Sequence, residues 1–167
     1  MIKKTALLSS LALSSLCFAA PVLAQTTAPA PAATVAKLVY NELADARAEL
    51  NQALATAQAQ RKNVLLVFGA NWCGDCLALD RKMSAGSLSE HVGKRLVVLK
   101  VNVGRFDRNV DLAAQIGVSL KKGIPAVAVL ANDGSVLKAT NGGELADARN
   151  MGDEAVLKVL EGLHGKT

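Results

Sequence analysis

Cysteine is scarce in this chain of 167 residues, which carries only three. One of them, Cys17, lies in an N-terminal stretch that we expect to be removed. Exported proteins that use cysteines as staples carry several pairs that close long loops, whereas Cys73 and Cys76 lie within four consecutive residues. The chain-entropy model gives so small a loop about 2 kcal/mol, against roughly 4.7 kcal/mol for a loop of about 100 residues. The pair is therefore a poor staple, and a chemical role explains it better.

A strong excess of charge is also missing. The formal net charge is +5, and removal of residues 1–24 takes away Lys3 and Lys4, which leaves +3. A charge this small belongs to an ordinary solvated surface and gives no argument for a nucleic-acid partner. Beyond the N-terminal stretch no apolar run approaches the ~20 residues that span a bilayer. We therefore expect no stable membrane insertion after residues 1–24 are removed.

The N-terminus itself has the pattern of a secretory signal peptide. Lys3 and Lys4 precede an apolar stretch over residues 6–20, and residues 22–24, Val-Leu-Ala, supply a small-residue cleavage site. We expect residues 1–24 to be the signal peptide and the mature chain to begin at Gln25. This interpretation predicts a periplasmic or secreted protein.

Two other interpretations of this stretch have less support. A membrane anchor is disfavoured because the apolar stretch is short and Pro21 interrupts it. Attachment of a lipid to Cys17 is disfavoured because Leu16 is bulkier than the small residue that usually precedes a lipidated cysteine.

Composition then divides the rest of the chain. Residues 25–36 are rich in Pro, Ala and Thr and are expected to form a disordered tether, which leaves residues 37–167 as the folded domain. Residues 37–60 are Ala-rich and are expected to form a helix packed on that domain. Its apolar stripe recurs every three or four positions, at Val39, Leu43, Ala46, Leu50 and Leu54.

Three short, continuous apolar runs are typical of strands buried on both faces. They cover residues 64–68, 96–101 and 126–130. Helices are expected at 73–83, where Gly86 ends the pattern, at 107–116, where Gly117 is the stop, and at 153–163. Residues 132–134, Asn-Asp-Gly, turn the third strand into a fourth over 135–139 as a hairpin. The order α-β-α-β-α-β-β-α predicts the α/β class, with a sheet sandwiched between helices.

The strongest chemical signal is Trp72-Cys73-Gly74-Asp75-Cys76, where the first strand ends and a helix begins. Cys73 falls at the helix N-terminus, where free N–H groups and the positive dipole end stabilise an anion. A thiolate there is a nucleophile at neutral pH. Cys76 lies one turn deeper on the same face, at a separation that a disulfide accepts. Cys73 is therefore predicted to attack a partner's disulfide and Cys76 to resolve the mixed disulfide.

Two alternatives for the cysteines remain open. Zinc needs three or four protein ligands, and only His91 and His164 could complete the set, neither with a paired spacing. The cysteines could also be inert and buried. We expect neither a metal nor a bound cofactor, since the redox-active group is the Cys73–Cys76 pair itself.

With these residues in view, the chain resembles the thioredoxin superfamily over about residues 60–163. The resemblance rests on the strand-WCxxC-helix segment, on Gly123-Ile124-Pro125 immediately before the third apolar run, and on the Asn-Asp-Gly hairpin followed by a helix. It is nearest to exported, single-domain thioredoxin-like proteins whose helix begins WCxDC. It implies the thioredoxin fold, a central mixed sheet flanked by helices.

The resemblance also implies roles for residues around the cysteines. Pro125 would face them, normally through a cis peptide bond, and would keep the Ile124 backbone free to pair with an extended substrate segment. A proline that merely opens a strand is the plainer interpretation. Trp72 and Gly74 belong to the motif. Lys100 matches a lysine near the active-site carboxylate of thioredoxins, although a lone lysine can also extend to the surface.

One departure concerns the acid that assists the deeper cysteine. Thioredoxins carry a buried aspartate six residues before the first cysteine, where this chain has Val67. The nearby acids are Asp75 and Asp80, both expected to be solvated on the helix surface, and Asp80 shares a helix face with Cys76. A carboxylate at Asp75 disfavours the thiolate and predicts a more reducing pair.

These features predict a thiol-disulfide oxidoreductase that acts on disulfides of exported proteins, as a reductase or exchanger more than a strong oxidant. Its partners would be protein thiols and disulfides, with electrons relayed by a membrane thiol carrier. The alternative from another class is a carrier of soft Cu(I) on the two thiolates, against which stands the lack of further Cys or Met near the motif. A non-catalytic scaffold is disfavoured because both cysteines are present.

Overall fold

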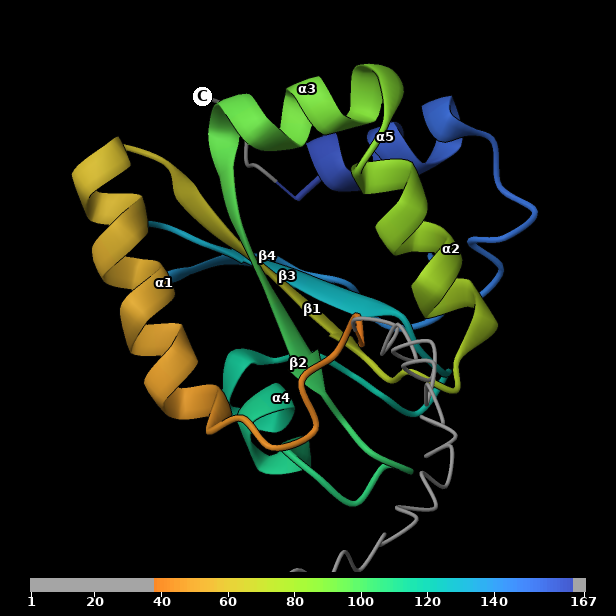
Figure 1. The fold of residues 1–167 in the computed structure, drawn as a ribbon, viewed down its shortest axis with the longest axis horizontal. Coiled ribbons are helices and arrows are strands. Elements are labelled where there is room, and N and C mark those ends of the chain that lie inside the picture. Colours follow the sequence, from red (N-terminus) through yellow and green to blue (C-terminus); the bar gives the residue numbers. More distant parts are fainter. Residues whose placement is uncertain (1–37, 164–167) are drawn as a thin grey trace, which may run out of the picture. The chain divides into compact units, whose positions relative to one another are not determined.

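The computed structural model describes residues 38–163. The expected signal peptide, 1–24, and tether, 25–36, lie outside the described residues. Nine elements follow one another along the chain (Figure 1): α1 Ala46–Gln60, β1 Asn63–Gly69, α2 Gly74–Met83, α3 Gly86–Arg95, β2 Leu96–Asn102, α4 Val110–Ile116, β3 Ala126–Leu130, β4 Val136–Ala139 and α5 Asp153–Glu161. None of the helices among them has the length and apolarity needed to cross a lipid bilayer.

The four strands form one mixed sheet in the order β2-β1-β3-β4. β1 is central: it pairs in parallel with β2 and antiparallel with β3, and β3 pairs antiparallel with β4. Six of the seven residues of β1 and all five of β3 are buried, as expected for strands covered on both faces. The three apolar runs and the hairpin are confirmed as the strands of the expected thioredoxin-type sheet.

Helices cover both faces of this sheet (Figure 1). α1 and α4 lie on one side, and α2, α3 and α5 lie on the other. Ion pairs join neighbours within each layer: Arg47 of α1 to Asp111 of α4 at 2.7 Å, and Lys82 of α2 to Asp153 of α5 at 3.0 Å. The second pair fixes the C-terminal turn of α2, at the opposite end of the helix from the turn that follows β1.

The first helix is shorter than expected. It begins at Ala46, capped by the Asp45 carboxylate, which accepts hydrogen bonds from the N–H groups of Arg47 and Ala48. Such a cap satisfies donors that the first turn leaves free. The prediction of a helix is wrong over residues 38–45, and Leu43, placed on its apolar stripe, is 95% exposed.

The segment before α1 is instead bonded to the turn that leads to the cysteines. Tyr40 is 1% exposed, and its backbone N–H and C=O both bond to the Asn71 side chain, at 2.9 and 2.8 Å. The Tyr40 hydroxyl lies against Gly69, where an added Cβ would be 2.3 Å from its oxygen. Tyr40 is therefore anchored against the turn that leads from β1 to α2.

One helix was not expected. Gly86, predicted to end the regular pattern after α2, adopts a φ of +62° and opens α3. α3 buries Leu88 and Val92, four residues apart and hence on one helix face. A positive φ suits glycine because it has no Cβ, so Gly86 redirects the chain between two helices.

Candidate active site

The two cysteines lie where β1 passes into α2. Cys73 is the N-cap of α2, and its Sγ accepts a hydrogen bond from the Cys76 N–H at 3.2 Å. The two residues form a disulfide with their Cα atoms 5.2 Å apart. Cys73 is 6% exposed and Cys76 is fully buried. The predicted placement at the helix N-terminus, with Cys73 the outer sulfur, is confirmed.

The segment before β3 forms the opposite side of the site. The Ile124–Pro125 peptide bond is cis, and both residues are buried. The Ile124 carbonyl oxygen lies 3.5 Å from Cys73 Sγ. Gly123 and Ile124 line a hollow of about 280 Å³ together with Trp72, Cys73, Gly74, Asp75, Phe106 and Arg149. The structure thus brings Ile124 to Cys73, with the cis Pro125 next to it in the chain, although the two segments lie far apart in sequence.

Trp72 borders this hollow in a fixed position. Its ring is 51% exposed, but its Nε1 donates a hydrogen bond to the Gly104 carbonyl at 2.7 Å. The Phe106 ring packs edge-on against Trp72, with the two ring centroids 6.1 Å apart, and the Arg105 guanidinium lies 5.8 Å from the Trp72 ring centroid. An exposed aromatic surface held in one orientation is suited to contact a partner polypeptide.

Asp75 is not the solvated surface acid that the sequence suggested. It is 8% exposed and accepts three hydrogen bonds from Arg149: from Nε at 3.0 Å, from Nη2 at 2.7 Å and from the backbone N–H at 3.1 Å. The Arg149 hydrogen bonds lower the pKa of the Asp75 carboxyl below its ordinary value. The carboxylate next to the cysteines is therefore ionised but paired.

Arg149 was not predicted as a site residue. It lies 74 positions from Asp75, and the chain carries no local motif around it that marks a site. Its guanidinium also covers Gly74, because an added Cβ at Gly74 would be 3.3 Å from Arg149 Nη2. The glycine of the motif leaves room for this side chain.

A second ion pair lies beneath the cysteines. The Lys100 ammonium bonds to the Asp80 carboxylate, and their side chains are 29% and 19% exposed. Asp80 is thus paired and mostly shielded, contrary to the expected solvated acid. Val67 is the register partner of Lys100 on β1, so the pair lies on the same face of the sheet as the position where thioredoxins carry their acid.

Tyr40 lies near the Lys100–Asp80 pair. Burial, together with the nearby Asp80 carboxylate, raises the pKa of the Tyr40 hydroxyl, so the side chain is a neutral phenol in the folded protein. Tyr40 was not predicted as a site residue, because its position fell within a helix that does not form there. No group of three or more His, Cys, Asp or Glu side chains within residues 38–163 is arranged to hold a metal.

Comparison with known proteins supports this geometry. The model of the thioredoxin-like family matches residues 45–132. The chain belongs to the thioredoxin-like family. With its CxxC pair joined as a disulfide, this thioredoxin-like protein is a protein-disulfide oxidoreductase. No curated protein matches the chain.

Solved structures agree with the assignment. A disulphide isomerase from Xylella fastidiosa Temecula1 is 43% identical, with 75% of this chain and 95% of that one covered and a TM-score of 0.70. A thioredoxin from Thermus thermophilus is 23% identical over 70% of this chain and 84% of that one, with a TM-score of 0.51. The C-terminal domain of Neisseria meningitidis DsbD in the oxidised form is 18% identical over 72% and 97%, with a TM-score of 0.51. The last two share the fold.

Proposed function

We propose that this thioredoxin-like protein reduces or exchanges disulfides of exported proteins in the periplasm. One observation carries the proposal: the outer sulfur, Cys73, caps a helix and faces an open hollow, while its partner Cys76 is fully buried one turn deeper. The signal-peptide pattern at residues 1–24 supports export. The resemblance to a disulphide isomerase at 43% identity supports action on protein disulfides.

The reaction proceeds through two exchanges. The Cys73 thiolate attacks one sulfur of the partner's disulfide, whose S–S bond breaks, and the partner's other sulfur leaves as a thiolate. The Cys76 thiol then loses its proton and attacks Cys73 Sγ, which releases the partner's second sulfur and forms the Cys73–Cys76 disulfide. Two electrons pass from the protein to its partner, and a membrane thiol carrier returns two electrons to the pair.

Asp80 is the group to which we assign the proton of Cys76. It lies four residues after Cys76, on the same face of α2, and the Lys100 ammonium holds its carboxylate. Tyr40 beneath it is neutral and contributes no competing charge. The Asp80–Lys100 pair would thus take the role of the aspartate that thioredoxins carry at the position of Val67.

The direction of electron flow follows from the charges at the other end of the pair. Asp75 stays ionised beside the sulfurs, because Arg149 lowers the pKa of its carboxyl, and a negative charge there disfavours the Cys73 thiolate. Arg149 offsets part of this effect. A reductase or exchanger, more than a strong oxidant, is the resulting assignment.

Trapping of the mixed disulfide tests the proposal. Cys76→Ser should leave Cys73 joined to the natural partner, because the resolving sulfur is missing, whereas the matched Cys73→Ser variant should trap little because Cys76 is buried. Non-reducing gels of the periplasmic fraction detect the complex, and mass spectrometry identifies the partner. Complexes with Cys73→Ser alone would reverse the two roles, and complexes with neither variant would overturn the proposal.

A further inference from the structure

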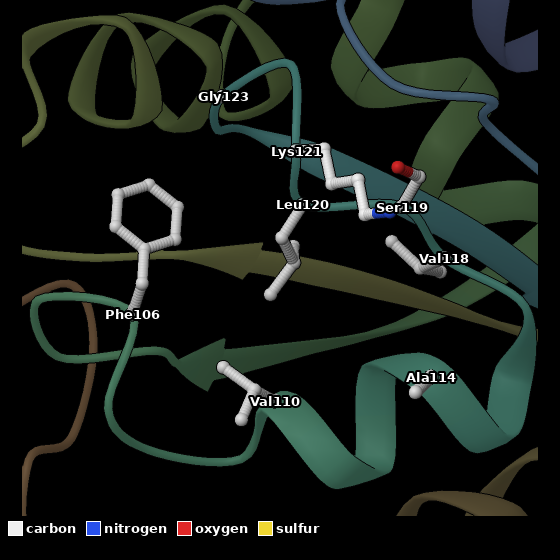
Figure 2. A pocket seen from close by; sticks show the side chains of 8 residues that line it. All are labelled: Phe106, Val110, Ala114, Val118, Ser119, Leu120, Lys121 and Gly123. Carbon is white, nitrogen blue, oxygen red and sulfur yellow. The ribbon is translucent and has the colours of Figure 1, made fainter.

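An apolar groove lies beside the site, on the side of α4. It measures about 670 Å³, and Figure 2 shows Phe106, Val110 and Ala114 along one side of it and Val118 and Leu120 along the other. Phe106 is 42% and Val110 is 40% exposed. A concave site lined mostly by apolar side chains is typical of ligand-binding sites.

The groove continues into the hollow over Cys73. Phe106 and Gly123 line both, and Ile124, the next residue after Gly123, lies against Cys73 Sγ. Phe106 is fixed at the junction by its contact with Trp72 and by a hydrogen bond from its N–H to the Val103 carbonyl at 2.8 Å. A polypeptide whose disulfide lies over Cys73 can therefore run directly into the groove.

We propose that the groove takes a large apolar side chain of the partner polypeptide, about two or three residues from the cysteine that Cys73 attacks. Few residues can separate the two side chains, because Phe106 and Gly123 line both hollows and an extended chain advances about 3.3 Å per residue. The inference rests on the proposed function and adds to it a preference for partners with a particular sequence around the cysteine.

Charge at the rim further defines the occupant. Lys121 lines the groove, and both Lys121 and Lys122 are exposed. An acidic residue next to the apolar one would therefore be favoured on the partner. The preferred substrate is an extended segment that carries an apolar and an acidic residue close to its cysteine.

Two peptides test the groove. Each has one cysteine joined to a small thiol as a mixed disulfide, with leucine three residues away and glutamate beside it in one peptide, and serine in place of leucine in the other. The reduced protein should react with the leucine peptide roughly tenfold faster, since filling an apolar pocket gives discrimination of this order. A small aromatic disulfide provides the reference rate.

Matched valine variants locate the effect. Val110→Ser should lower the leucine-to-serine rate ratio severalfold, whereas Val136→Ser, at a valine that is 45% exposed on β4 and outside the groove, should leave the ratio unchanged. Ala114→Trp, which fills the groove from an exposed position of α4, should also abolish the preference.

The outcomes separate this inference from the proposed function. Equal rates for the two peptides, with a normal reaction of the small disulfide, would overturn the groove and leave the oxidoreductase intact. No reaction with any disulfide would overturn the proposed function itself. Self-association that Val110→Ser abolishes would assign the groove to a second copy of the chain and contradict the inference.

Discussion

At the scale of single residues, Val67 and Asp80 concern the place of the acid near the cysteines. Val67 is 1% exposed on β1, where a carboxylate would be buried beside Lys100. The lysine instead reaches across to Asp80 on α2. The acid that pairs with Lys100 therefore lies on α2, next to the cysteines in sequence, and not on β1.

Asp80→Asn tests whether this acid accepts a proton from Cys76. We expect release of a small thiol from a Cys73 mixed disulfide to slow by on the order of 10-fold to 100-fold at neutral pH, because a positioned general base is removed. The difference should narrow above the ordinary thiol pKa of about 8.5, where Cys76 ionises unaided. Stopped-flow measurements of thiol release across pH provide the readout.

Asp153→Asn is the matched control, since Asp153 also pairs with a lysine, Lys82 of α2, but through a side chain that is mostly exposed. Its pH profile should coincide with that of the unchanged protein. A loss of rate in Asp80→Asn that stays constant at every pH would indicate a purely structural role for Asp80.

Local spacing made some site residues predictable and others not. Cys73 and Cys76 could be placed on α2 because the strand before them and the helix after them are both visible in the sequence. Arg149 could not be paired with Asp75, because only the folded chain brings the segment before α5 to the first turn of α2. Tyr40 was missed because the spacing of Val39 and Leu43 on either side of it imitates a helix.

At the scale of elements, helix boundaries were the weak point. The apolar spacing of Val39 and Leu43 pointed to a start for α1 earlier than the Asp45 cap that the structure shows. α3 was not predicted, because glycine commonly stops helices and Gly86 was therefore expected to end the regular pattern. Strands were predicted well because β1, β2 and β3 consist mostly of apolar residues, with Lys100 the one charged residue among them.

The ion pair between α2 and the segment before α5 should set the redox poise. Asp75→Asn leaves the Arg149 cation unpaired near Cys73, which favours the thiolate and should raise the reduction potential. Arg149→Met leaves the Asp75 carboxylate unpaired and should lower it. We expect shifts of about 30 mV, equivalent to about 1.4 kcal/mol, in each direction, measured by equilibration with glutathione.

The double variant serves as the internal control for this pair. With both charges removed, the potential should return close to that of the unchanged protein. Shifts of the same sign in both single variants would contradict an electrostatic origin and point to a change in packing.

At the scale of the whole molecule, the redox state and the fold are coupled. If the folded pair is more reducing than the same cysteines in the unfolded chain, the oxidised protein must be the more stable form, by about 1.4 kcal/mol for every 30 mV. Urea unfolding of the oxidised and reduced proteins should therefore give a larger free energy of unfolding for the oxidised form, by about 2 kcal/mol. A more stable reduced form would identify a disulfide donor.

The central place of β1 in the sheet also determines the order in which the site can be assembled. Residues 63–76 carry β1 and both cysteines, but the register pairs Val64 with Leu130, so the antiparallel neighbour of β1 is synthesised much later. Such distant pairing slows folding, because the loop must close before the contacts form. During synthesis both cysteines therefore emerge about 50 residues before Ile124, which lies against Cys73 Sγ only once β3 has paired with β1. A partly synthesised chain would thus carry its two thiols before the opposite side of the site exists.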